Sequence, residues 1–383
     1  MFWKKRTYLD TAAGVGGNSS SPHTEGRHAK KMLEEARTVI ARLAEVQSDD
    51  VIFTSGATEA NALAILGHVH ALRLRAGSDT AGRNNMHILY LPSAHASIVE
   101  NAKLLAAEGV AVEKLPIKDA RVDTGALAKM LRGETVLVSM DAVCGETGVV
   151  WNTREVAEVL KRARGGGTAA RTLLHVDASQ APLTEKISRA HFDADLLTFD
   201  APKVGEVRGI GALIAHRTIP LAPLYGGGGQ ERGLRSGSGT PELARSFAAA
   251  LGAAAQNREK FCASALRERA QLVKRIMSAV PDVFINEGRA QVSNILNLSL
   301  PGRDTDYLAT LLDEAGFAVS TRSACETDSE EGSRAVFELT SDAERARSTL
   351  RVSWGPSVSQ RELNRFAEAL AGAVAFIDSN SRR

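Results

Sequence analysis

Cysteine is scarce in this sequence, and neither sign of charge is in excess. The three cysteines, Cys144, Cys262 and Cys325, lie far apart and lack the paired spacing of a structural zinc site or a disulfide framework. Lysine and arginine total 47 against 45 aspartate and glutamate residues, a net charge of +2. Such a balance does not favour a nucleic acid or a membrane surface as the principal partner. We therefore expect a reducing compartment, no metal site and a small-molecule substrate.

Long apolar runs are also absent from the sequence. Residues 1–6 lead into a strand-like segment at 7–9 without the apolar stretch of a signal peptide. No later run is long enough to span a bilayer. The sequence therefore predicts a cytoplasmic protein.

The chain has an ordinary globular composition, arranged in alternating strand-like and helix-like segments. Hydrophobic residues make up 44% and charged residues 24% of its 383 residues, a length that favours one large domain and a smaller one. Apolar positions spaced by three and four predict a helix over 26–43, and the segment 58–74 is a second helix candidate. Short apolar runs predict strands at 51–54, 87–90, 136–139, 173–176 and 196–199. Several strands buried on both faces imply a mostly parallel sheet wrapped by helices.

The turns after these strands are where chemistry is expected, because open parallel sheets bind ligands beyond the carboxyl ends of their strands. Ala57 and Thr58 open a helix after a turn of small residues, which suits a phosphate but is equally good capping chemistry. Asp177 could pair with a pyridinium nitrogen or cap the next helix. Lys203 is either a solvated charge or, if buried, an amine that binds a cofactor covalently. At each position the residues alone leave both interpretations open.

A series of longer motifs runs along the chain. They are Leu-Asp-Thr-Ala-Ala at 9–13, Asn-Ser-Ser-Ser at 18–21, His-Thr-Glu-Gly-Arg at 23–27, Ile-Phe-Thr-Ser-Gly-Ala-Thr-Glu-Ala-Asn at 52–61, Ala-His-Ala-Ser at 94–97 and Gly-Gly-Gly-Gln-Glu-Arg-Gly-Leu-Arg-Ser-Gly at 227–237. In content and order they resemble the cysteine desulfurases of the class V aminotransferase group. The resemblance covers nearly the whole chain.

This resemblance implies an α/β architecture of fold type I, the fold of a large group of pyridoxal-phosphate enzymes. A large domain over 14–245 would hold a mostly parallel seven-stranded sheet and the cofactor. A smaller α+β domain, formed by 1–13 and 246–383, would carry the loop of Cys325. An alanine-rich helical region from 241 to about 279 is expected to link the two. A homodimer is implied as well.

The resemblance also implies a role for each residue of a pyridoxal-phosphate site. Lys203 matches the lysine that binds the cofactor, His95 the residue that stacks on its ring, and Asp177 and Gln180 the partners of its pyridine nitrogen and phenolic oxygen. The phosphate would be held by Ala57 and Thr58, and by Ser238 of the neighbouring subunit. The substrate, L-cysteine, would be held by Arg351, whose guanidinium suits a carboxylate, with Cys144 and Asn18 beside it.

The segment 316–325 resembles the one that leads to the family's catalytic cysteine, which ends in Gly-Ser-Ala-Cys. Its polar continuation over 326–332 predicts a mobile loop. Cys325 would attack the substrate's sulfur as a thiolate and carry the persulfide to an acceptor, leaving L-alanine. Lys203 or His95 would move the protons. The acceptor would be a sulfur-acceptor or scaffold protein of iron–sulfur or thio-cofactor assembly.

Several positions depart from the family pattern, and they lie in the cofactor pocket. Pro202 stands where histidine normally precedes the lysine. Asp200 stands where a serine or threonine binds the phosphate, and its like charge should weaken phosphate binding. Cys144 and Gly145 replace the two asparagines of an Asn-Asn-Glu motif, and a thiol is a poor substitute for an amide donor. The turn at 205–208 is altered and the segment between 13 and 18 is short, so the substrate mouth is expected to be remodelled.

These departures leave three hypotheses. In the first, the protein is a cysteine desulfurase. In the second, it is a related pyridoxal-phosphate lyase or transaminase with another substrate, for which Cys325 is dispensable. In the third, it is a catalytically impaired scaffold paralogue that binds the cofactor weakly. Since the residues matching the lysine, its ring partners and the sulfur-carrying cysteine all remain, we favour the first.

Overall fold

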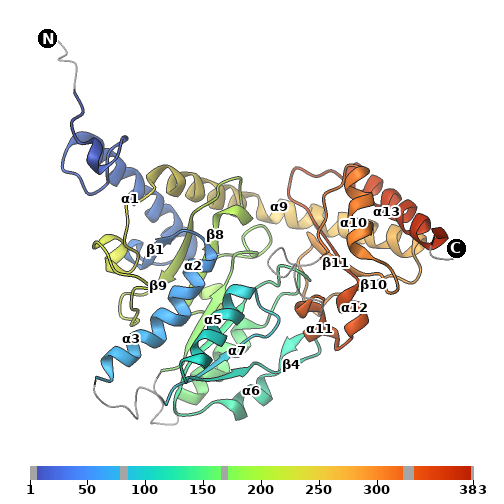
Figure 1. Ribbon diagram of the computed structural model, residues 1–383, viewed down its shortest axis with the longest axis horizontal. Helices are drawn as coiled ribbons and strands as arrows, with labels where there is room; N and C mark the ends of the chain where they lie inside the picture. The colour runs from blue at the N-terminus through green and yellow to red at the C-terminus, as the bar shows by residue number, and fades with distance from the viewer. Residues whose placement is uncertain (1–6, 78–84, 165–170, 322–331, 381–383) are drawn as a thin grey trace.

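A computed structural model describes residues 7–77, 85–164, 171–321 and 332–380 (Figure 1). Residues 322–331, which include Cys325 and most of its expected loop, lie outside the described residues. Within these ranges, none of the helices is apolar and long enough to cross a membrane.

A seven-stranded sheet forms the centre of the larger part of the chain, in the order β1-β9-β8-β7-β6-β2-β3. Its strands are β1 (Val51–Thr54), β2 (His87–Tyr90), β3 (Ala111–Lys114), β6 (Thr135–Asp141), β7 (Leu173–Asp177), β8 (Leu196–Asp200) and β9 (Gly211–Ala215). Neighbouring strands are parallel except at β9, which pairs antiparallel with both β1 and β8. The mostly parallel sheet expected from the short apolar runs is therefore confirmed.

Helices cover this sheet and continue into the C-terminal part. They are α1 (Thr24–Ala44), α2 (Ala57–Ala62), a π-helical turn at Leu63–Gly67, α3 (His68–Arg75), α5 (Ala96–Ala107), α6 (Thr124–Met130), α7 (Thr153–Arg164), α8 (Arg189–Phe192), α9 (Pro241–Ala279), α10 (Thr305–Glu314), α11 (Arg334–Thr340), α12 (Ala343–Arg347) and α13 (Gln360–Asn380). In α1, Ala29, Leu33, Ala36 and Ile40 are buried, which confirms the helix predicted from their spacing. The second predicted helix is the continuous run of α2, the π-helical turn and α3.

Helix α9 is 39 residues long and joins two hydrophobic clusters. Its first half contributes Phe247 and Leu251 to the cluster around the large sheet, whereas Phe261 and Leu272 belong to a second cluster. Figure 1 shows α9 running from the large sheet towards the C-terminus, with α13 beside its far end. A small antiparallel sheet of β10 (Phe284–Ile285), β11 (Ile295–Ser299) and β12 (Thr349–Ser353) completes the second cluster. A division near residue 245, within α9, stays our proposal.

Residues 7–13 contact the segment that follows them. The Tyr8 hydroxyl donates to the Gly14 carbonyl at 2.7 Å, and an Asp10 oxygen lies 2.9 Å from His23 Nε2. In Figure 1 this segment lies at the end of the molecule opposite the C-terminus. Within one copy of the chain, residues 7–13 thus accompany the entry to α1 rather than the second cluster.

A buried ion pair fastens the glycine-rich segment 226–237 to the sheet. Arg37 of α1 donates to both oxygens of Glu231 at 2.7 and 2.8 Å, and each side chain is only 9% exposed. The Phe53 backbone N–H of β1 donates to the same carboxylate at 2.8 Å, and Arg37 also donates to the Val51 carbonyl at 2.7 Å. The Glu231 backbone is left-handed, with φ +47°. Such a conformation is costly for a non-glycine residue and persists only where other contacts hold it.

We predict that Glu231→Gln lowers the melting temperature and the free energy of unfolding, the latter by about 3 kcal/mol or more. The substitution removes the buried counter-charge of the Arg37 guanidinium, which then keeps only Glu34, a half-exposed carboxylate at 3.2 Å. Differential scanning calorimetry measures the effect. Glu100→Gln is the matched control, because Glu100 and Lys103 form an exposed pair at 2.8 Å, which contributes less than about 1 kcal/mol. Equal effects of the two substitutions would contradict this account of the ion pair.

Candidate functional site

A pocket opens at the carboxyl edge of the large sheet, where it meets the C-terminal part of the chain. Its lining comes from the turns after β2, β6, β7 and β8, from the start of α11 and from β12. The residues are Ser93, Ala94, His95, Ala96, Asp141, Cys144, Gly145, Glu146, Gln180, Lys203, Arg334, Ala335 and Arg351. Five residues singled out from the sequence, His95, Cys144, Gln180, Lys203 and Arg351, therefore lie around one pocket.

Lys203 reaches this pocket because β8 ends in a tight turn. The strand is buried as far as Phe199, and a 3₁₀ turn over Ala201–Lys203 follows at once. Pro202 occupies the start of that turn, where its fixed φ suits helical backbone and no N–H is lost from the helix. Pro202 is thus compatible with the turn that brings Lys203 to the pocket.

Asp177 ends β7 and is only 5% exposed. Asn61 of α2 donates to its Oδ2 at 2.7 Å, while the backbone N–H and the hydroxyl of Ser179 donate to its Oδ1 at 2.9 and 2.5 Å. Three donors stabilise the ionised form of a carboxyl group. Asp177 is therefore suited to hold a negative charge next to Asp141, which lines the pocket.

His95 caps the N-terminus of α5. Its Nδ1 accepts the backbone N–H of Ser97 at 3.2 Å and lies 2.8 Å from the Ser97 hydroxyl. Because Nδ1 is an acceptor, Nε2 carries the proton when the ring is neutral. The contact orients the imidazole at the wall of the pocket, as a ring that stacks on a ligand requires.

Asp200 occupies the place where the sequence predicts a phosphate. Its Oδ1 accepts the backbone N–H of Ala57, the first residue of α2, at 3.1 Å. Burial raises the pKa of Asp200, and the charge of Asp177 adds to this, whereas the Ala57 N–H and Lys203 act in the opposite direction. One N–H of the expected phosphate cradle is therefore already engaged by a carboxyl group of the chain itself.

Cys144 is 2% exposed, and burial is the main cause that raises the pKa of its thiol to about 12, with Asp141 and Glu146 adding to it. A protonated thiol is a weak nucleophile. Cys144 therefore lines the pocket as an uncharged thiol and is not suited to receive sulfur.

The C-terminal part of the chain holds the loop that carries Cys144. Arg351 of β12 donates to the Gly145 carbonyl at 3.1 Å, Asn297 of β11 donates to the Glu146 carbonyl at 3.2 Å, and Ser333 donates to a Glu146 carboxylate oxygen at 2.6 Å. These contacts place the Arg351 guanidinium at the pocket. An arginine fixed there can bind a substrate carboxylate.

Asn18 and Ser238, predicted to bind substrate and phosphate, contact each other instead. The Asn18 amide lies 3.4 Å from the Ser238 hydroxyl, and neither residue lines the pocket of its own chain. Thr58, in the first turn of α2, does not line the pocket either. Cys325 lies outside the described residues, so its position relative to Lys203 stays a prediction.

Three residues that the sequence reasoning did not single out also shape the site. Asn61 and Ser179 hold Asp177, and Asp141 lines the pocket. Asn61 closes the motif at 52–61 and Ser179 follows Asp177 by two positions, so both carried a local signal. For Asp141 the signal was an acidic residue at the end of a strand that is buried along its whole length.

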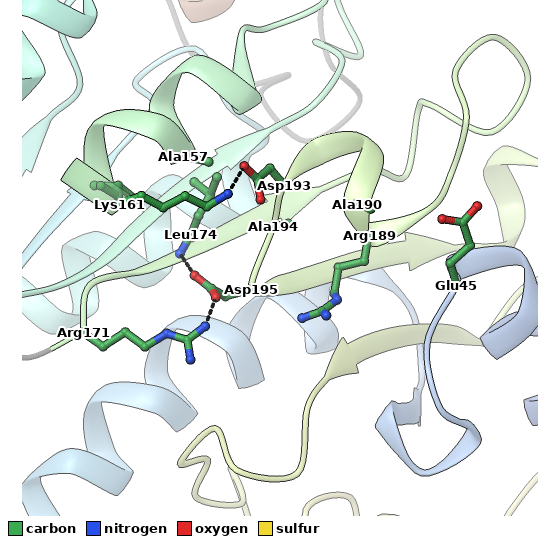
Figure 2. A pocket seen from close by; sticks show the side chains of 11 residues that line it. Glu45, Ala157, Lys161, Arg171, Leu174, Arg189, Ala190, Asp193, Ala194 and Asp195 are labelled. Carbon is green, nitrogen blue, oxygen red and sulfur yellow. Dashed lines mark hydrogen bonds and ion pairs between the residues drawn. The ribbon is translucent and has the colours of Figure 1, made fainter. Parts of the chain in front are cut away.

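A second pocket lies at the opposite edge of the sheet, where β7 and β8 begin. Figure 2 shows two ion pairs among its charged side chains, Lys161 with Asp193 and Arg171 with Asp195. Asp195 also accepts the backbone N–H of Leu174 at 2.9 Å. The Asp195 contacts connect the starts of β7 and β8, so we assign this pocket a structural role.

Comparison with known proteins agrees with this geometry. The family model for aminotransferase class-V matches residues 5–366. The chain is 29% identical to cysteine desulfurase IscS 1 of Archaeoglobus fulgidus, over 95% of this chain and 91% of that protein. It is 32% identical to the mitosomal cysteine desulfurase of Encephalitozoon cuniculi, over 94% and 80%.

Among solved structures, a NifS-like protein has a TM-score of 0.83 at 25% identity and covers 96% of this chain and 93% of its own. DndA of Streptomyces lividans has a TM-score of 0.72 at 30% identity, with 91% and 94% covered. These matches span nearly the full length of both partners. The chain belongs to the class V aminotransferase family and, within it, to the cysteine desulfurases.

Proposed function

We propose that this protein is a pyridoxal-phosphate-dependent cysteine desulfurase that removes sulfur from L-cysteine. The observation that carries the proposal is the convergence of Lys203, His95, Gln180 and Arg351 on one pocket. Asp177, a carboxylate with three donors, is paired in register with Asp141 of the pocket wall. Membership of the desulfurase family supports the same conclusion.

The side chains around the pocket fit the ring and the aldehyde of pyridoxal phosphate. Asp177 would face the pyridine nitrogen, Gln180 the phenolic oxygen and His95 the ring, while the amine of Lys203 would bind the aldehyde carbon. At the phosphate end, the phosphate would compete with Asp200, because the Ala57 N–H already donates to the Asp200 carboxyl group. When bound, the cofactor withdraws electrons from the α-carbon of an amino acid attached to it.

Residues of the chain would bind the substrate, keep the pyridine nitrogen protonated and transfer protons. Arg351 would bind the carboxylate of L-cysteine and fix the orientation of the substrate. Asp177, held anionic by its three donors, would keep the pyridine nitrogen protonated. Lys203 and His95, which line the same pocket, would move protons to and from the substrate carbon.

Cys325 would receive the sulfur of the substrate. Its thiolate attacks the substrate's sulfur, the S–S bond forms as the carbon–sulfur bond breaks, and the carbon takes up a proton. L-cysteine and the enzyme thiol thus become L-alanine and an enzyme persulfide, with no external oxidant or reductant. A sulfur-acceptor or iron–sulfur scaffold protein would then receive the terminal sulfur by thiol exchange.

We predict that Cys325→Ser abolishes both alanine release from L-cysteine and persulfide formation. Alanine is measured by amino-acid analysis and the persulfide by mass spectrometry of the intact chain. Cys262→Ser is the control, because the Cys262 thiol donates to the Thr184 carbonyl at 3.3 Å and does not line the pocket. Undiminished turnover in Cys325→Ser would favour a lyase or transaminase with another substrate.

We also propose a homodimer in which Asn18 and Ser238 serve the partner's pocket. Two observations support it. First, Asn18 and Ser238 contact each other and do not line the pocket of their own chain. Second, Leu9 and Val15, in the segment before α1, are 90% and 88% exposed, so this segment offers apolar side chains that a partner subunit can cover.

Complementation tests this arrangement. Ser238→Asp alone should weaken pyridoxal-phosphate binding, because it brings a negative charge to the partner's phosphate, and Lys203→Ala alone should abolish the covalent absorption band. Mixed dimers of the two variants should regain tight binding at one of two sites, since one pocket then combines Lys203 with an intact Ser238. Titration of the near-visible band measures this. Mixtures that bind no better than Ser238→Asp alone would refute the shared site.

We predict that Asp200→Ser tightens pyridoxal-phosphate binding by about tenfold, because it removes a like charge from the phosphate's neighbourhood and frees the Ala57 N–H. The gain should shrink as the pH falls, since the raised pKa of Asp200 means that it is protonated earlier than an ordinary carboxyl group. Equilibrium titration of the absorption band measures both effects.

Two controls separate this effect from others. Asp193→Ser removes a carboxylate at the opposite edge of the sheet, where it pairs with Lys161, and should leave the affinity unchanged. Pyridoxal, which lacks the phosphate, should bind wild type and Asp200→Ser equally. If Asp200→Ser binds pyridoxal phosphate no more tightly than wild type, Asp200 does not compete with the phosphate.

A further inference from the structure

Two buried polar atoms in the wall of the pocket have no hydrogen-bond partner among the described residues. They are Oδ1 of Asp141 and Oγ of Ser93, and both residues are 4% exposed. A buried polar atom without a partner costs about 1–3 kcal/mol. Two such atoms in one pocket indicate a bound group that completes their hydrogen bonds.

Asp141 and Asp177 are neighbours in the sheet. They end the parallel strands β6 and β7 and are directly paired in register. Their surroundings differ, however, because three donors hold Asp177 whereas Asp141 Oδ1 has none. Of two adjacent carboxyl groups that cannot both ionise easily, the one with fewer donors keeps the proton, and Asp141 has only a hydrogen bond from its own backbone N–H.

The other groups around Asp141 agree with this assignment. Burial is the main cause that raises the pKa of Asp141 to about 8, and the charge of Asp177 adds to it, whereas a hydrogen bond from its own backbone N–H and the charge of Arg334 of α11 act in the opposite direction. The titratable and charged groups that face it or share its pocket are Asp177, Cys144, Glu146, Arg334, Lys203, His95 and Arg351. At neutral pH, Asp141 is therefore a carboxylic acid whose O–H can be donated.

We propose that Asp141 is a cofactor-positioning residue: as a neutral acid it donates a hydrogen bond to an anionic oxygen of the bound ring, replacing the amide donor lost at Cys144. The proposal rests on the proposed function for the identity of the ligand. It explains why a chain whose Cys144 thiol is a poor donor carries a carboxyl group with an unpartnered Oδ1 three residues earlier, in the same wall of the pocket.

The test measures pyridoxal-phosphate affinity by titration of the near-visible band at pH 7, 8 and 9, without L-cysteine. Above the pKa of Asp141 the wild type loses its donor and gains a negative charge, so its affinity should fall by about tenfold between pH 7 and 9 relative to Asp141→Asn. Asp141→Asn keeps a neutral donor at every pH. Its affinity at pH 7 should stay within about threefold of wild type.

A second variant removes the donor altogether. Asp141→Leu should bind about tenfold more weakly at pH 7, the effect of one hydrogen bond to a charged group. Asp141→Leu combined with Cys144→Asn should recover most of this loss, because the asparagine restores an amide donor. A cavity or a packing defect alone would not be rescued in this way. Circular dichroism checks that each variant is folded.

The outcomes are distinct from those of the desulfurase test. If wild type binds the cofactor with the expected pH dependence but releases no alanine, the proposed function fails and this inference stands. If Asp141→Leu binds as tightly as wild type, or if Asp141→Asn shows the wild-type pH dependence, Asp141 is not the donor. Absence of cofactor binding in wild type and every variant would also overturn it. Should Asp141→Leu not fold, the Asp141→Asn comparison still decides.

Discussion

Parallel strands that end at one edge bring their last residues together, and in this protein three of those residues are acidic. Asp141 and Asp177 are paired in register at the ends of β6 and β7, and Asp200 ends the next strand, β8. Burying several like charges side by side is unfavourable unless each is compensated. The chemistry of the pocket depends on how this constraint is met.

The three carboxyl groups are accommodated in three different ways. Asp177 is stabilised as an anion by Asn61 and Ser179. Asp200 accepts a backbone N–H at the start of α2, where the helix dipole favours negative charge. Asp141 has a raised pKa and keeps its proton. The result is a pocket with fewer negative charges at neutral pH than its sequence suggests, which a cofactor with an anionic phosphate and phenolate requires.

The sequence predicted most of the fold because its signals are local. The spacing of apolar residues in α1 and the runs at β1, β2, β7 and β8 specify burial on one face or two, and the observed elements differ from those predictions by few residues. The antiparallel direction of β9 was not anticipated, because the apolar pattern of a buried strand is the same for either direction. The carboxyl-edge pocket followed from the topology, so the turns of His95, Gln180 and Lys203 could be identified in advance.

What the sequence could not supply was the state of each side chain. Whether Asp200 repels a phosphate depends on its contact with the Ala57 N–H, and whether Cys144 weakens the site depends on what stands nearby. The first is a long-range contact, because Ala57 and Asp200 lie 143 residues apart. The second depends on the proton of Asp141, which is influenced by Asp177 on the neighbouring strand. A substitution that looks damaging along the sequence, such as Cys144, can be balanced by an acid such as Asp141 in the same wall. Departures from a family pattern therefore have to be judged as a set, by the charge and the donors that the pocket presents together.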